Sequence, residues 1–254
     1  MRILLVGLLL TASTLAFADE NELLRIDTRP GVRVSLYYMK RDGAPATVVL
    51  LPGGGGSLGL KGGIPTSQNF LVRSRDYFAA NGFNVAVVNR PSGQALDYEF
   101  RISSEHIQDL RQVVRYIKRD TGLPVWLVGT SRGTISATAA AIAFGTEELA
   151  GIVLTASVTS PKKTGAVPAQ NLEAIRIPVA VLHHEKDACA VTRPGEVSWI
   201  ISGLKNAPVK KQIMVNGGDN PTGDPCQAMH WHGFFGMEKA AVDIIAGWIR
   251  NPKP

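Results

Sequence analysis

The segment PVWLVGTSRGTISATAAAIAF, residues 124–144, decides the fold. Its first part, residues 124–128, is apolar and predicts a buried strand, whereas residues 134–144 are apolar on nearly all sides and predict a buried helix. Between them, residues 129–133 read Gly-Thr-Ser-Arg-Gly, which is a G-x-S-x-G pattern. Because the glycines lack a Cβ, the backbone can turn sharply from strand to helix and project the serine hydroxyl. Ser131 is therefore a candidate nucleophile.

Strands and helices alternate along the rest of the chain. Apolar or alternating stretches predict strands at residues 22–29, 32–39, 46–51, 83–88, 151–155, 177–182 and 209–215. Apolar residues at helical spacing predict helices at residues 68–81, 103–117, 194–204 and 237–248. The first two strands flank Pro30-Gly31 and are expected to form a hairpin. Alternation of this kind indicates an α/β fold with a mostly parallel sheet and helices on both faces.

The first 18 residues have the pattern of a secretory signal peptide. Arg2 precedes an apolar core at residues 3–10, and the small-residue site Ala16-Phe17-Ala18 precedes Asp19. We therefore expect cleavage after Ala18, a single mature domain at residues 19–254, and a periplasmic or secreted location. The apolar core is short for a membrane span, so no stable membrane insertion is expected after cleavage.

Charge and cysteine content narrow the function classes. The chain has 27 Lys and Arg residues against 21 Asp and Glu residues, a net charge of +6. The densest basic pairs, Lys162-Lys163 and Lys210-Lys211, have no interleaved aromatic residues, so nucleic acid is not an expected partner. The two cysteines, Cys189 and Cys226, are expected to form a disulfide, because an exported chain meets an oxidising compartment.

A glycine-rich run also matches the dinucleotide-binding pattern G-x-G-x-x-G, at Gly54, Gly56 and Gly59. In that motif a helix begins directly after the glycines, whereas here residues 60–65 contain two further glycines and a proline. We therefore expect no dinucleotide site and no cofactor.

The strand alternation, the G-x-S-x-G turn and a later Asp and His together resemble the α/β-hydrolase superfamily over essentially the whole mature chain. In that fold the acid follows a late strand and the histidine precedes the last helix. The resemblance implies that Ser131 attacks an acyl carbon, that His232 moves the proton and that Asp187 orients His232. Glu185 and the more distant Asp224 remain alternatives for the acid, and His230 remains the alternative for the base.

The resemblance also implies an oxyanion hole, which holds the negative oxygen of the tetrahedral intermediate. One donor is the N–H of the residue after the nucleophile, here Arg132. The other is an N–H from the loop after an early strand, where Gly53 and Gly54 stand. Many esterases have His-Gly-Gly-Gly at this place, whereas this chain has Leu51-Pro52-Gly53-Gly54. Pro52 has no N–H to donate, and either glycine remains a candidate.

The segment between the strands at 151–155 and 177–182 is short for a sizeable cap domain. We therefore expect an open cleft walled by the loops at residues 54–67, 91–102 and 158–175, which favours a small-molecule or bulky ester as substrate. Within this cleft, Arg101 and Arg132 are candidates to bind a substrate carboxylate, with a structural ion pair or solvent exposure as the alternatives.

The leading prediction is an exported serine hydrolase that cleaves carboxylic esters. Amide or thioester cleavage by the same residues is the alternative within that class. Metal-dependent hydrolysis is a second class, because one part of the chain holds several candidate ligands, namely His183, His184, Asp187, His230 and His232. A binding protein without catalysis on the same fold is the third. His106 lies before the G-x-S-x-G turn and is expected on a helix surface.

Overall fold

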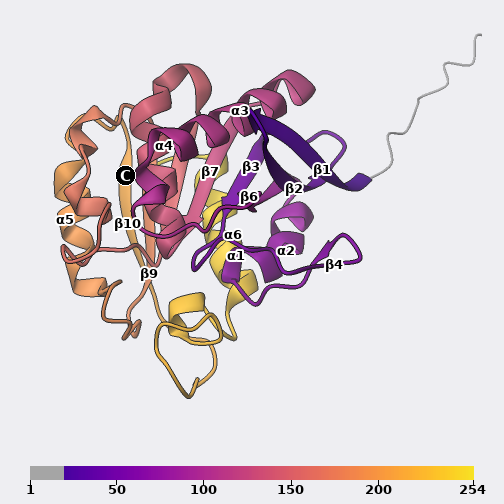
Figure 1. Ribbon diagram of the computed structural model, residues 1–254. Helices are drawn as coiled ribbons and strands as arrows, with labels where there is room; N and C mark the ends of the chain where they lie inside the picture. The colour runs from indigo at the N-terminus through magenta and orange to yellow at the C-terminus, as the bar shows by residue number, and fades with distance from the viewer. Residues whose placement is uncertain (1–19) are drawn as a thin grey trace, which may run out of the picture.

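The computed structural model describes residues 20–254, and the expected signal peptide at residues 1–18 lies outside them. Within the described part, eight strands form one sheet in the order β1-β2-β6-β3-β7-β8-β9-β10 (Figure 1). In chain order, the strands of this sheet are β1 (Glu20–Arg29), β2 (Val32–Lys40), β3 (Thr47–Leu51), β6 (Asn84–Pro91), β7 (Val125–Thr130), β8 (Gly151–Thr155), β9 (Val179–His184) and β10 (Lys210–Val215).

The sheet is parallel from β6 to β10 and antiparallel at its other end. β1 and β2 form the expected hairpin, and β2 pairs antiparallel with β6. β3 pairs in parallel with both β6 and β7, and the remaining neighbours are parallel as well. The carboxyl ends of β3, β7 and β9 therefore meet at one edge of the sheet, where the loops after them can share a site.

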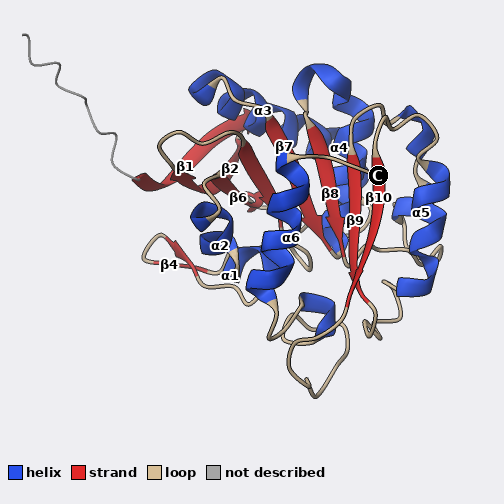
Figure 2. Ribbon diagram, turned by 180° about the vertical axis from the view of Figure 1, so that it is seen from behind, coloured by secondary structure: helices blue, strands red, loops and turns tan. Residues whose placement is uncertain are grey.

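Helices cover both faces of the sheet. One face holds α3 (Ser104–Thr121), α4 (Arg132–Glu148) and α5 (Val197–Gly203). The other holds α1 (Phe70–Arg73), α2 (Arg75–Ala80) and α6 (Glu238–Arg250). Figure 1 shows α4 in front of the sheet, and Figure 2, seen from behind, shows α6 in front of it.

Alternate side chains of the buried strands pack against opposite helical layers. In β3, Val49 and Leu51 pack with the α3, α4 and α5 layer, whereas Val48 and Leu50 pack with the opposite layer. Successive strand residues point to opposite faces, so a strand covered on both sides must be apolar throughout. The continuous apolar run at residues 46–51 has this cause.

Several predicted elements differ in detail from the structure. The helix expected at residues 68–81 is two short helices that meet at Ser74, because α1 packs on β3 and β7 while α2 packs on β6 and α6. The strand expected at residues 177–182 extends to His184. The expected loop at residues 54–67 contains a small hairpin of β4 (Leu60–Lys61) and β5 (Ile64–Pro65).

The segment between β8 and β9 contains only two short 3₁₀ turns, η2 (Val167–Ala169) and η3 (Leu172–Ala174). The described chain therefore has no cap domain at this place, as predicted from the length of the segment. Among residues 20–254, no helix is both long and apolar enough to span a membrane.

Candidate active site

Ser131 sits at a sharp turn between β7 and α4. Its φ is 51° and its ψ is −127°, an uncommon backbone conformation for a residue with a side chain. Its N–H donates to the carbonyl oxygen of Thr155 on β8 at 3.0 Å, which fixes the turn against the neighbouring strand. Strain of this kind is found at functional sites, where the surrounding structure holds it in place.

The two glycines of the G-x-S-x-G pattern are required by close backbone contacts. A Cβ on Gly133 would lie 2.0 Å from the carbonyl oxygen of Leu51, and a Cβ on Gly129 would lie 2.5 Å from that of Gly133. Any side chain at these positions would push α4 away from β3 and β7. The pattern therefore allows α4 to begin directly against the ends of the two central strands.

Asp187 lies in the loop after β9, and His232 lies in the short turn before α6. Their side chains are in contact in the structure. Asp187 Oδ2 lies 3.0 Å from His232 Nδ1, and both side chains are buried. Asp187 Oδ1 accepts the N–H of Cys189 at 3.0 Å. Because Nδ1 of His232 faces the carboxylate, its Nε2 is the ring nitrogen left for proton exchange.

Thr192 also contacts this pair, and the sequence analysis missed it. Its hydroxyl donates to Asp187 Oδ2 at 2.9 Å and lies 3.1 Å from His232 Nδ1. The carboxylate of Asp187 therefore has three partners, Cys189, Thr192 and His232, which together fix its orientation. A threonine five residues after an acid carries no recognisable signal in one sequence.

The alternative acids and base lie elsewhere. Glu185 accepts a hydrogen bond from Asn216 at 2.9 Å on the surface. Asp224 is exposed and accepts the N–H of Cys226. His230 is buried edge-on against the ring of Trp231, and its Nδ1 has no hydrogen-bond partner within the described chain. The structure thus brings together Asp187 and His232, while their catalytic role stays a prediction.

The glycine loop after β3 borders Ser131. A Cβ on Gly53 would lie 2.8 Å from the Cβ of Ser131, so the backbone of this loop closely approaches Ser131. Gly54 has a φ of 56°, which favours glycine. Arg132 is the first residue of α4, where backbone N–H groups have no partner inside the helix. Gly53 and Gly54 therefore line the same cleft as Ser131, and Arg132 directly follows Ser131 in the chain.

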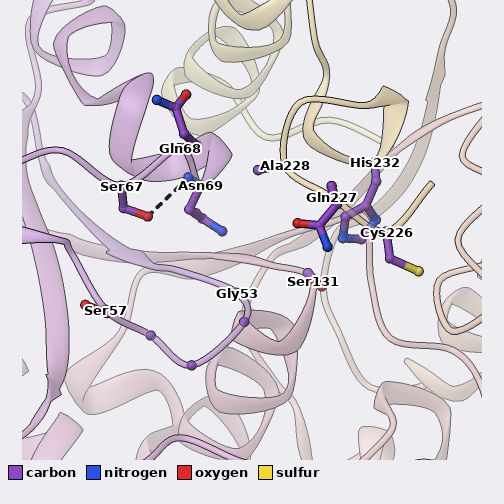
Figure 3. Close-up of a pocket in the computed structure, with 13 residues that line it drawn as sticks. Gly53, Ser57, Ser67, Gln68, Asn69, Ser131, Cys226, Gln227, Ala228 and His232 are labelled. Carbon is purple, nitrogen blue, oxygen red and sulfur yellow. Dashed lines mark hydrogen bonds between the residues drawn. The ribbon is translucent and has the colours of Figure 1, made fainter. Parts of the chain in front are cut away.

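A cleft of about 360 Å³ opens at this point. Figure 3 shows Ser131 with Gly53 on one side and the loop that carries Gln227 and His232 on the other. Apart from His232, the side chains that line the cleft are small or are polar and uncharged, and none of them is a large apolar side chain. The complete lining is Gly53, Gly54, Gly55, Gly56, Ser57, Ser67, Gln68, Asn69, Ser131, Cys226, Gln227, Ala228 and His232.

Arg73 forms hydrogen bonds to two segments on different sides of the cleft. The sequence analysis did not predict these contacts. Its guanidinium donates to the carbonyl oxygens of Gln68 and Gly233, both at 2.6 Å, and pairs with Glu238 at 2.8 Å. Gly233 directly follows His232. The turn that carries the histidine is therefore held against the start of α1 across the cleft.

The other histidines are structural. His183 Nε2 accepts the N–H of Ser157 at 2.6 Å, and burial lowers the pKa of His183 to about 4, so the ring is neutral near pH 7. His184 lies between the N–H of Lys186 and the carbonyl oxygen of Gly217. Within residues 20–254, no group of three or more His, Cys, Asp or Glu side chains is arranged to hold a metal ion.

The expectation that His106 lies on a helix surface is wrong. The side chain is buried beneath α4, and its Nε2 lies 2.9 Å from the hydroxyl of Ser136. His106 stands four residues before Leu110, so helical spacing already places it on the apolar face of α3.

The predicted disulfide between Cys189 and Cys226 is confirmed. Cys189 follows Asp187 by two residues, and Cys226 lines the cleft six residues before His232. The bond therefore connects the loop that carries Asp187 to the loop that carries His232.

We expect a Cys189→Ala, Cys226→Ala double variant to lose about 3 to 4 kcal/mol of unfolding free energy, the chain-entropy value for a sequence separation of 37. Ester hydrolysis should fall by about tenfold or more, because Asp187 and His232 then lose their common tether. Urea unfolding and kcat measure the two effects separately. Unchanged kcat at wild-type circular dichroism would show that the bridge acts on stability only.

No protein-family profile and no curated protein matches the sequence, whereas many solved structures match the fold. An esterase of Pyrococcus furiosus aligns over 91% of both chains, with a TM-score of 0.64 and 14% identity. A dienelactone hydrolase of Anabaena variabilis covers 91% of this chain and 97% of its own, with a TM-score of 0.63 and 14% identity.

An α/β serine hydrolase homologue of Coxiella burnetii covers 93% of this chain and 100% of its own, with a TM-score of 0.65 and 15% identity. Identities this low show a common fold and leave the reaction open. The matching structures agree with the sheet order, the strand-to-helix turn at Ser131 and the helices on both faces. This chain has the α/β-hydrolase fold.

Proposed function

We propose that the protein is a serine hydrolase that cleaves carboxylic esters through an acyl-enzyme. The observation that carries this proposal is the arrangement of the cleft. Ser131, held at a positive φ, and His232, paired with the buried Asp187, line the same opening. Nucleophile, base and orienting acid are the three groups that acyl transfer requires at one point.

In the proposed reaction, Ser131 Oγ attacks the carbonyl carbon of the ester while His232 Nε2 takes its proton. The tetrahedral oxyanion accepts hydrogen bonds from the N–H of Arg132 and from Gly53 or Gly54. When the carbon–oxygen bond to the leaving group breaks, the imidazolium gives its proton to the departing alcohol. Water, activated by the same histidine, then attacks the acyl-enzyme and releases the acid.

Amides and thioesters are alternative substrates for the same residues. Metal-dependent hydrolysis has less support, since His183 and His184 make buried contacts with backbone groups and lie apart from the cleft lining. A binding protein without catalysis would not need the strained backbone at Ser131.

Export is part of the proposal. The predicted signal peptide at residues 1–18 and the Cys189–Cys226 disulfide both point to an oxidising compartment, the periplasm or the exterior of the cell. A mature N-terminus at Asp19 in exported material would support cleavage at the predicted site.

The function is tested by a hydrolysis screen of p-nitrophenyl esters, thioesters and peptides, with fluorophosphonate labelling read by intact mass. We expect labelling at Ser131, and acetyl esters to be cleaved at least about tenfold faster than octanoyl esters, because the cleft offers no large apolar surface for a long chain. Activity that a chelator abolishes, without labelling, would instead support a metal-dependent hydrolase. Neither activity nor labelling would support the binding protein.

A further inference from the structure

Arg101 carries a buried positive charge next to the glycine loop. It belongs to η1 (Phe100–Ile102) and is only 1% exposed. One terminal nitrogen, Nη2, donates to the carbonyl oxygens of Pro52 and Gly54, each at 3.1 Å, and Nη1 donates to the hydroxyl of Ser136 at 2.8 Å. All three acceptors are neutral. Both alternatives expected for Arg101, an ion pair or solvent exposure, are therefore wrong.

A guanidinium in this position is energetically costly. Burial lowers the pKa of Arg101 to about 9, and the neighbouring charge of Arg132 acts in the same direction, whereas Asp97 and Tyr98 act against it. The group nevertheless stays cationic near pH 7. Removing a charge from water without a carboxylate to neutralise it is uncommon, which points to a role other than stability.

The hydrogen bonds beyond Arg101 fix its orientation. Burial lowers the pKa of His106 to about 3, so its ring is neutral and its Nε2 can accept the hydroxyl proton of Ser136. Ser136 in turn accepts from Arg101. Ser136 lies on α4, the helix that begins at the nucleophile, and His106 lies on α3. The plane of the guanidinium is therefore anchored to the same helix that follows Ser131.

The two carbonyl groups held by Arg101 belong to the oxyanion loop. In a planar trans peptide the C=O and the next N–H point in opposite directions. Because the carbonyl oxygen of Pro52 faces Arg101, the N–H of Gly53 faces away from it. The carbonyl oxygen of Gly53 accepts the N–H of Gly56 at 3.0 Å, which fixes the N–H of Gly54 in the same manner. The directions of the Gly53 and Gly54 N–H groups are thus fixed by hydrogen bonds to the carbonyl oxygens of the same peptide groups.

We propose that Arg101 is a positioning residue for ester hydrolysis, which holds the Pro52–Gly54 backbone so that its N–H groups meet the developing oxyanion. Its charge also polarises the Pro52–Gly53 peptide and strengthens the Gly53 N–H as a donor. Arg101 touches neither substrate nor reacting atoms and acts through the loop. This inference rests on the proposed function of the cleft.

The test compares Arg101→Met and Arg101→Lys with wild type on p-nitrophenyl acetate. We expect Arg101→Met to lower kcat by about 10² to 10³-fold with little change in KM, which is the usual effect of losing one oxyanion donor. Arg101→Lys keeps the charge but lacks the second terminal nitrogen that bonds Ser136 while Nη2 bonds both carbonyl oxygens, and should recover about tenfold of that loss. Active-site titration of Ser131 with a fluorophosphonate corrects every kcat for misfolded protein.

A trifluoromethyl ketone separates positioning from a general structural role. Its adduct with Ser131 carries an oxyanion, so its inhibition constant should rise by the same factor as kcat/KM falls across the variants. The matched control is Arg111→Met on α3, which also removes an arginine bonded to a backbone carbonyl, that of Ala143, but far along α4 from Ser131. That variant should keep the wild-type kcat.

Two results would overturn the proposal for Arg101. One is a titration-corrected kcat of Arg101→Met within about threefold of wild type; the other is an inhibition constant that does not follow kcat/KM. If Arg101→Met does not fold, a wild-type kcat in Arg101→Lys is equally decisive. Failure of the proposed function is a different outcome, since wild type itself would then neither hydrolyse esters nor be labelled at Ser131.

Discussion

Replacement of Ser131 by alanine is expected to lower kcat for ester hydrolysis by at least about 10⁴-fold, because the proposed acyl-enzyme forms on the hydroxyl that this change removes. The fold should remain intact. Alanine keeps the Cβ, so the backbone strain at φ 51° is unchanged, and the N–H bond to Thr155 belongs to the main chain. Hydrolysis of p-nitrophenyl acetate and urea unfolding measure the two quantities.

Ser74→Ala is the matched control for this experiment. Its hydroxyl is buried and has no hydrogen-bond partner within the described chain, so its removal should change neither kcat nor stability appreciably. Wild-type activity in Ser131→Ala would remove the nucleophile from the proposed mechanism. A large loss in both variants would point to misfolding instead.

Asp187→Asn is expected to lower kcat by about 10⁴-fold, since the asparagine amide has only one acceptor oxygen for three donors. Its NH₂ group would face either His232 or the N–H of Cys189. The imidazole would then favour the wrong tautomer, with its proton on the nitrogen that should act as base. Steady-state kinetics at neutral pH measure the loss.

Glu185→Gln serves as the matched control, because its carboxylate lies at the surface and bonds Asn216. We expect its kcat to stay within about twofold of wild type. A greater loss in Glu185→Gln than in Asp187→Asn would transfer the role of the acid to Glu185. The same comparison between His232→Ala and His230→Ala tests the base, and the first should be the more damaging.

The sequence predicted those parts of the structure that local pattern determines. The strand, turn and helix around Ser131 follow from two glycines and two apolar runs, and the parallel sheet follows from continuous apolar strands. The order of the strands in the sheet follows from no single segment. The break at Ser74 was missed because α1 and α2 are divided by packing against different partners.

Contacts between residues distant in sequence account for the unpredicted part of the site. Arg101 bonds Pro52 and Gly54, which lie 49 and 47 residues away in the sequence. Arg73 bonds Gly233, which lies 160 residues away. Charged side chains are usually exposed, so composition gives no reason to expect a buried arginine. His106 differs, since its spacing from Leu110 already indicated the apolar face of its helix.

The sheet order places the residues of the candidate site on parts of unequal local stability. β7, before Ser131, has strands on both sides, whereas β10, which precedes the His232 loop, has one neighbour within the described chain. Amide hydrogens of central strands exchange through global unfolding, and those of edge strands exchange through cheaper local openings. His232 can therefore leave the cleft in a partly open molecule in which Ser131 is still in place. The bond from Cys226 to Cys189 limits such openings, because it joins the loop after the edge strand β10 to the loop after its neighbour β9.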